Sequence, residues 1–79
     1  MSPTVFKEAG FRFHFFSREE TRLHVHVLHE AGEAKFWLNP AIELALNSGL
    51  NARLLAKAEH LIREHEDEIR SAWQQHFPG

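Results

Sequence analysis

His24 and His26 are separated by a single residue, and their spacing is the one in this chain that best suits metal binding or acid–base catalysis. In an extended strand, residues two apart point to the same face, about 6.5–7 Å from each other, so both imidazoles can reach one ion. Zinc binds imidazole nitrogens and needs three or four ligands, and His14 is the candidate for a third. The alternation places no carboxylate on this face. Zinc is therefore one hypothesis, beside histidines that are simply solvated or paired.

The same residues would also suit RNA or a protein partner. A histidine pair can act as general base and general acid on a ribose 2′-hydroxyl without a metal. A sheet face with aromatic rings for stacking and cations for phosphates is a known way to hold single strands. Seven residues of these types share one predicted sheet face, which we expect to contact RNA or a partner: Arg12, His14, Phe16, His24, His26, Lys35 and Trp37.

Composition argues against a general affinity for nucleic acid. The formal net charge is −2 with histidine neutral, and the chain has no tyrosine. Its seven histidines make the charge sensitive to pH near neutrality. The sequence contains no P-loop, nucleophile elbow, zinc-protease motif or dinucleotide-binding fingerprint. Enzymatic activity is left open; if the protein is an enzyme, a ribonuclease that uses His24 and His26 is the hypothesis.

Alternating hydrophobicity predicts the strands that would position these side chains. Between about residues 3 and 38, apolar residues recur at every second position, and glycine-containing turns interrupt the pattern at 8–10 and 30–32. The simplest assembly is a four-stranded antiparallel β-meander. Its core face is predicted to carry Phe11, Phe13, Phe15, Leu23, Val25, Val27, Ala34, Phe36 and Leu38. The fold class is therefore α+β, with one sheet face left for binding.

The second half of the chain predicts two helices. Asn39 and Pro40 are typical of a helix start, which places a first helix at about 40–47. Asn51 would cap a second, long helix that continues to about residue 76. A helix of about 25 residues spans roughly 37 Å, whereas the sheet measures roughly 20 Å on a side. Three apolar residues near its end would need cover from a partner, a second copy or the first helix: Ile69, Trp73 and Phe77.

Length and composition limit the number of domains, the kinds of cross-link and the compartment that the protein can have. Seventy-nine residues predict a single domain over 1–79. The chain has no cysteine, which excludes disulfides and thiolate metal sites and suits a reducing compartment. The first residues do not resemble a signal peptide, and no apolar run approaches the roughly 20 residues of a membrane-spanning helix. We therefore expect a cytoplasmic protein without a membrane partner.

Several segments together resemble one bacterial family. They are PTVF at 3–6, GFRFHFFS at 10–17, HVHV at 24–27, GEAKFWL at 32–38, and the terminal helix with its tryptophan and phenylalanine. Over nearly the whole chain, this pattern resembles the domain of unknown function 4160 family. In that family the loop before HVHV usually carries prolines, which Thr21, Arg22 and Leu23 replace here.

The resemblance implies a small cytosolic protein, often encoded beside a second small protein of the domain of unknown function 2442 type. Such a pair resembles a toxin–antitoxin module. The resemblance brings no set of catalytic residues. It favours a component of such a pair that acts through protein–protein binding, with the neighbour or a second copy as partner. RNA binding or cleavage by the histidine-rich face and a zinc site are the alternatives.

Overall fold

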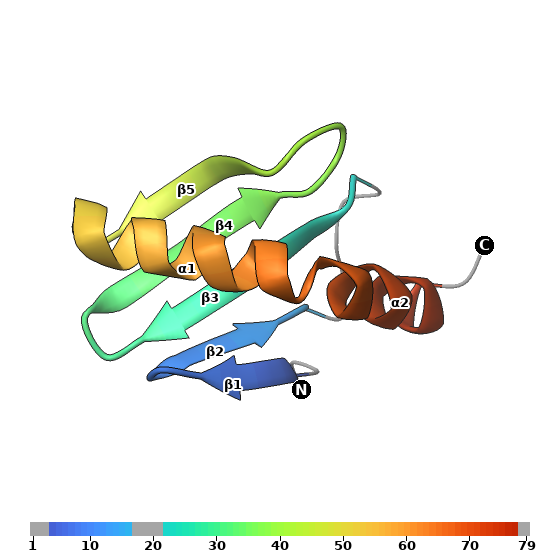
Figure 1. Ribbon diagram of the computed structural model, residues 1–79, viewed down its shortest axis with the longest axis horizontal. Coiled ribbons are helices and arrows are strands. Elements are labelled where there is room, and N and C mark those ends of the chain that lie inside the picture. Colours follow the sequence, from blue (N-terminus) through green and yellow to red (C-terminus); the bar gives the residue numbers. More distant parts are fainter. Residues whose placement is uncertain (1–3, 17–21, 78–79) are drawn as a thin grey trace.

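A computed structural model describes residues 4–16 and 22–77, which form one antiparallel sheet followed by two helices (Figure 1). The strands are β1 (Thr4–Glu8), β2 (Phe11–His14), β3 (His24–His29), β4 (Gly32–Trp37) and β5 (Glu43–Ser48). The helices are α1 (Ala52–Glu64) and α2 (Glu66–His76). The strands lie in the order β1-β2-β3-β4-β5, so each pairs with its neighbour in sequence. The predicted α+β class and meander are confirmed, but the sheet has five strands and not four.

Period-two alternation sorts the side chains of β2, β3 and β4 onto two faces, as the sequence predicted. Phe13, Val25, Val27 and Phe36 have almost no exposed surface and form the centre of the core. The helix α1 crosses this face of the sheet (Figure 1). It contributes Ala58, Leu61 and Ile62, all fully buried, to the same core. Burial of each large apolar side chain contributes about 1.5–3 kcal/mol, so this layer is the main source of stability.

The first hairpin shows how the turn sequence sets the register. Between β1 and β2, Ala9 and Gly10 both have positive φ, at 53° and 84°. Positive φ at both central residues is the geometry of a two-residue hairpin turn whose twist matches that of the strands. The turn therefore pairs Lys7 with Arg12 and Glu8 with Phe11. The sequence predicted the position of this turn but gave it three residues.

The predicted first helix at 40–47 was wrong, because these residues form β5. Its residues pair antiparallel with β4, for example Leu46 with Lys35 and Glu43 with Trp37. Asn39 and Pro40, joined by a cis peptide bond, lie in a bend between β4 and β5 and do not start a helix. A strand here pairs the backbone hydrogen-bonding groups of β4, which a short helix would leave without strand partners.

The predicted long helix was also wrong, since the chain forms two helices that meet at His65. Asn51 does cap α1, and its side-chain oxygen accepts a hydrogen bond from the Leu54 amide at 2.8 Å. At the other end, the amide of His65 donates to the carbonyl of Leu61, and α2 begins with Glu66. Three acidic residues fill the first turn of α2, where negative charge is favourable. Residues 52–76 therefore do not extend past the sheet as one straight helix.

The helix α2 packs past the end of the sheet at which β2 ends and β3 begins (Figure 1). There Arg70 donates hydrogen bonds to the carbonyl of Leu38 at 2.8 Å and to the side-chain oxygen of Asn39 at 3.1 Å. It also contacts Glu66 on its own helix at 2.9 Å. Neither α1 nor α2, the helices of the described residues, is long and apolar enough to cross a membrane.

Candidate functional site

The sheet face turned away from α1, called the open face below, carries most of the predicted site residues. Cross-strand pairing arranges them in rows. One row holds Lys7, Arg12, Leu28, Glu33 and Ser48; the next holds Thr4, His14, His26, Lys35 and Leu46; a third holds His24, Trp37 and Glu43. The strands therefore bring all seven predicted open-face residues into one area, with Phe16 against the ring of His26 at 4.4 Å.

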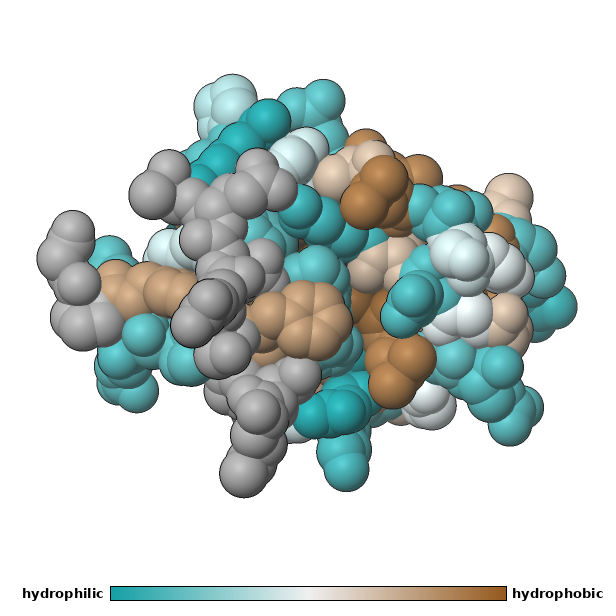
Figure 2. Space-filling model, turned by 180° about the vertical axis from the view of Figure 1, so that it is seen from behind, coloured by the Kyte–Doolittle hydropathy of each residue, from teal (hydrophilic) through white to brown (hydrophobic). Residues whose placement is uncertain are grey.

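Large hydrophobic side chains remain exposed on this face. Phe16 is 43% exposed, Leu28 40% and Leu46 66%. Figure 2 shows the open face, where hydrophobic residues lie between hydrophilic ones across the middle of the sheet. Among the described residues, Leu44 of β5 is the one other large hydrophobic side chain with comparable exposure. Sequence reasoning left Leu28 and Leu46 out of the site, although alternation already placed Leu28 on this face.

The three histidines of the middle strands form a packed cluster. The rings of His14 and His26 lie 5.5 Å apart, and those of His24 and His26 lie 5.2 Å apart. His24 has no exposed surface, because the rings of Trp37 and Trp73 pack against it at 5.5 and 5.1 Å. Its Nδ1 lies 2.7 Å from the carbonyl oxygen of Arg22. A carbonyl only accepts, so this nitrogen carries the proton, and a substrate on the open face does not reach the ring.

His14 has an environment that disfavours its charged form. Burial is the main cause of its lowered pKa, and the nearby charges of His26 and then Arg12 lower it further. Its Nδ1 is buried and has no hydrogen-bond partner within the described residues. His14 is therefore neutral near pH 7, a state that suits a proton acceptor or an uncharged wall of a binding surface.

Trp37 is covered by two cations. The guanidinium of Arg22 lies 4.2 Å from the ring centroid and the ammonium of Lys35 lies 4.4 Å from it, both over the ring. Cations at such distances are attracted by the ring quadrupole. Arg22 is further held by the carbonyl of Asn39 at 2.7 Å and lies 3.8 Å from Glu43. Sequence reasoning missed Arg22, because it precedes the strand and the alternation does not reach it.

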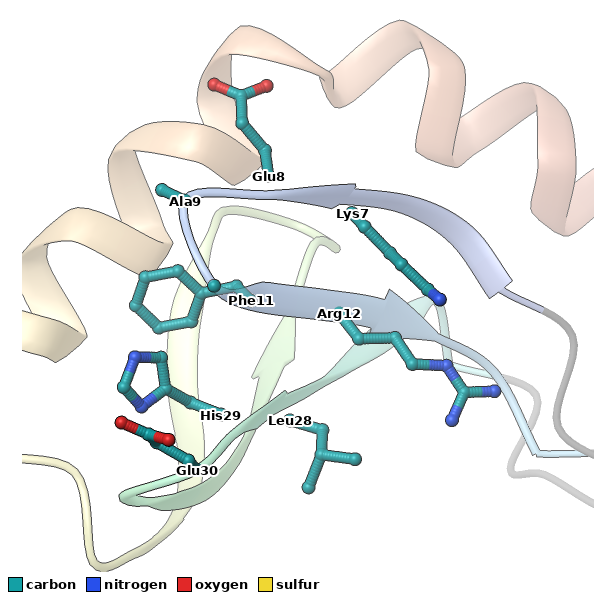
Figure 3. A pocket seen from close by; sticks show the side chains of 9 residues that line it. Lys7, Glu8, Ala9, Phe11, Arg12, Leu28, His29 and Glu30 are labelled. Carbon is teal, nitrogen blue, oxygen red and sulfur yellow. The ribbon is translucent and has the colours of Figure 1, made fainter.

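Two hollows lie along the open face and its edge. One, of about 350 Å³, is lined by His14, Phe16, His26, Lys35 and Leu46, among others. The other, of about 690 Å³, lies by the two hairpin turns that join β1 to β2 and β3 to β4. Figure 3 shows that Lys7 and Arg12 extend side by side there, whereas Glu8 points towards the helices.

The predicted helix interface is packed inside the chain. Ile69 is fully buried, and Trp73 and Phe77 are half-buried against the core. The ring of Trp73 lies 5.3 Å from Phe15 and 4.4 Å from Phe77. Because α2 bends to the end of the sheet, these residues find their cover within the same chain.

The residues of the three-histidine cluster were also the candidates for zinc. Within residues 4–16 and 22–77, no group of three or more histidine, cysteine or acidic side chains is arranged to hold a metal ion. The rings of His14 and His26 stack on each other, whereas Phe16 and His24 each meet the ring of His26 edge-on. Zinc binding stays a prediction that only a measurement on the protein tests.

Comparison with protein families identifies the chain. A family model described as a domain of unknown function (DUF4160) matches residues 10–74. The chain belongs to this family. The match confirms the resemblance drawn from the sequence motifs. No curated protein and no solved structure matches the chain.

The DUF4160 match covers the part of the molecule that forms the site. It includes β2, β3, β4, β5, α1 and most of α2, and so contains the histidine cluster together with Leu28, Lys35 and Leu46. The edge strand β1 (Thr4–Glu8), with Lys7, lies outside the matched residues. The middle and the β5 side of the open face therefore lie within the residues that match the family.

Proposed function

We propose that the protein acts by binding another protein through its open face, as one component of a cytoplasmic toxin–antitoxin-like pair. The observation that carries this proposal is the exposure of Phe16, Leu28 and Leu46 on one face of a small domain. Exposed apolar patches with a polar rim are typical of interaction sites. The resemblance of the sequence to a family encoded beside a second small protein supports a dedicated partner.

The size of the apolar contribution supports specific binding. Fully burying a leucine or phenylalanine contributes about 1.5–3 kcal/mol. Phe16, Leu28 and Leu46 are roughly half exposed, so burying them in an interface would contribute roughly half of that free energy for each side chain. Together they would contribute about 3 kcal/mol, enough for a small cluster of dominant contacts at the centre of an interface. The aromatic residues of α2 contribute little to such a surface, because they already pack on the core.

Light scattering of the protein, alone and mixed with the small protein encoded beside it, tests the proposal. We expect a complex with the neighbour that Leu46→Arg weakens, because the substitution places a charge on the apolar patch. Ala56→Arg, on an exposed position of α1, is the matched control and should leave the complex intact. A protein that never binds the neighbour, or a complex equally insensitive to both substitutions, would refute it.

A ribonuclease or RNA-binding function is the second candidate, favoured by the close pair His14 and His26, whose rings lie 5.5 Å apart. The sequence-based version used His24 and His26, but His24 lies beneath two tryptophans. If this face cleaves RNA, His14→Ala or His26→Ala should relieve growth arrest caused by expression. Harmless expression of the wild type together with no cleavage of RNA would exclude this function.

Zinc binding is the third candidate and has a direct assay. Metal analysis of the purified protein should give about one zinc per chain if three histidine ligands hold an ion, and His26→Ala should remove it. A protein that purifies without zinc, and whose histidine resonances do not respond to added zinc, has no such site.

A further inference from the structure

We infer that the partner of the open face is an acidic, apolar segment of a different protein, and neither a second copy of this chain nor RNA. This inference rests on the proposed function and specifies the chemistry of the partner.

The first observation is the sign of the charge on the open face. Within residues 4–16 and 22–77, the three rows of the face together with Arg22 carry four permanent cations and two carboxylates. The cations are Lys7, Arg12, Arg22 and Lys35, and the carboxylates are Glu33 and Glu43. The helices carry five acidic and four basic residues. A protein with a net charge of −2 therefore has a cationic binding face. Complementary potentials steer partners to each other and suppress wrong ones, so an acidic segment is favoured.

The second observation is the distribution of apolar surface between these cations. Leu28 stands in the row between Arg12 and Glu33, and Leu46 stands beside Lys35. The hollow of about 350 Å³ lies next to Lys35, with Phe16 and Leu46 among its lining residues. Figure 3 shows Leu28 on the side of the sheet to which Lys7 and Arg12 extend. A partner that carries apolar and acidic side chains on the same face would fill the hollow and place its carboxylates near the cations.

Like charge disfavours a second copy on the same face. A two-fold dimer is isologous, so the same patch must face itself. Two open faces together would bring eight permanent cations, two copies each of Lys7, Arg12, Arg22 and Lys35, against four carboxylates, two copies each of Glu33 and Glu43. Like charges placed against each other in an interface are strongly unfavourable. The face is therefore built for a heterologous partner.

The chemistry of the exposed side chains disfavours RNA. Proteins that hold single strands on a sheet stack bases on several aromatic rings. Here Trp37 already has Arg22 and Lys35 over its ring, and His24 is buried. Much of the exposed apolar surface is instead aliphatic, from Leu28 and Leu46, which supplies no platform for stacking. Apolar side chains of a protein fit this surface better than bases.

Fluorescence anisotropy with three labelled probes tests the inference. The probes are a short peptide that carries leucine and glutamate side chains on the same face, the same peptide with lysine in place of glutamate, and an oligouridylate. We expect the acidic peptide to bind at least about tenfold more tightly than the basic one, because like charge repels the latter. Lys35→Glu and Lys7→Glu should each weaken the acidic peptide by about tenfold, and the double substitution Leu28→Ser with Leu46→Ser by at least as much. Lys57→Glu, the same charge change on an exposed position of α1, should alter binding less than about twofold.

Several results of these binding measurements would overturn the inference. No preference for the acidic peptide would refute the charge argument, and oligouridylate binding that survives the leucine substitutions would point to RNA. A wild-type dimer that Leu46→Ser dissociates would point to a second copy. The proposed function is tested separately. A complex with the encoded neighbour that is indifferent to Lys35→Glu would refute this inference alone. Binding of the acidic peptide without any complex with the neighbour would refute only the named partner.

Discussion

His65, at the junction of α1 and α2, joins the helical layer to the edge strand β1 through an interaction that depends on pH. Its Nδ1 lies 2.8 Å from Glu68 and its Nε2 lies 3.0 Å from Glu8, while its ring stacks on Phe6 at a centroid distance of 3.9 Å. Ionised carboxylates only accept hydrogen bonds, so both ring nitrogens must carry a proton, and the ring is an imidazolium. The hydrogen bond to Glu68 is the main cause of the raised pKa of His65.

The sign of the resulting pH dependence follows from the direction of that shift. A histidine whose pKa is higher in the folded protein stabilises it fully below the ordinary value of about 6.5. This contribution is lost as the pH rises through the folded-state pKa. The His65 ring is 28% exposed and both carboxylates are about half exposed, so solvent weakens the pair. We expect a loss of about 1 kcal/mol, equivalent to about 4–8 °C in melting temperature for a domain of this size.

His65→Gln is the variant that isolates this interaction, with His60→Gln as its control. His60 is exposed and lies 3.3 Å from Glu64 on its own helix, so it should matter little. Urea unfolding at about pH 5.5 and about pH 8.5 gives the free energy of unfolding in the two protonation states. The wild type should lose about 1 kcal/mol more between these conditions than His65→Gln does. Equal pH dependence in the wild type and His65→Gln would refute the imidazolium bridge.

Three further predictions follow from burial and geometry. The wild type should lose stability as the pH falls below about 6.5, because the buried ring of His14 resists a proton that the unfolded chain accepts. His14→Phe should lose less stability over the same range, which urea unfolding at several pH values measures. Ile69→Ala should cost about 2–5 kcal/mol in thermal or chemical unfolding, whereas Leu46→Ala should cost less than about 1 kcal/mol; equal effects would contradict the assignment of Ile69 to the core. Gly32→Ala should destabilise the fold by about 1–3 kcal/mol or more, because the added Cβ would overlap the Ser48 carbonyl and lie 2.8 Å from the Gly49 Cα; calorimetry that finds it as stable as the wild type would contradict this close approach.

The sheet was the part of the fold that local sequence determined best. The alternation in β2 and β3 places phenylalanines and valines on one face and histidines on the other, and the structure keeps that division. A one-residue shift would expose the whole core face, so register follows directly from the pattern. The positions of both hairpin turns were also predictable, because the glycines at 10 and 32 mark the ends of alternating runs.

The two errors in the fold have specific physical causes. In the region of β5, Ile42, Leu44 and Leu46 alternate as a strand does, but the preceding Asn-Pro pair suggested a helix start. Pairing with β4 decides the outcome, and sequence periodicity alone does not reveal that pairing. In the region predicted as one long helix, the acidic residues at 66–68 are typical of a new helix N-terminus, and the prediction did not use this signal.

The sequence predicted which residues lie on the open face better than it predicted which of their side chains are accessible. Alternation indicates which face a side chain points to, but not what covers that face. His24 was therefore expected beside His26 as an accessible residue, whereas Trp73 of α2 reaches around the end of the sheet and helps to bury it. Leu46 was missed because it was placed in a helix, and its exposure depends on the fifth strand.

The most direct test of the central claim is a nuclear magnetic resonance titration of the labelled protein with the small protein encoded beside it. If the open face binds the partner, the largest shift changes should fall on Leu28, Lys35 and Leu46, and the exposed positions of α1 should remain unchanged. Changes centred on α1 and α2, or no change at saturating partner, would contradict the account.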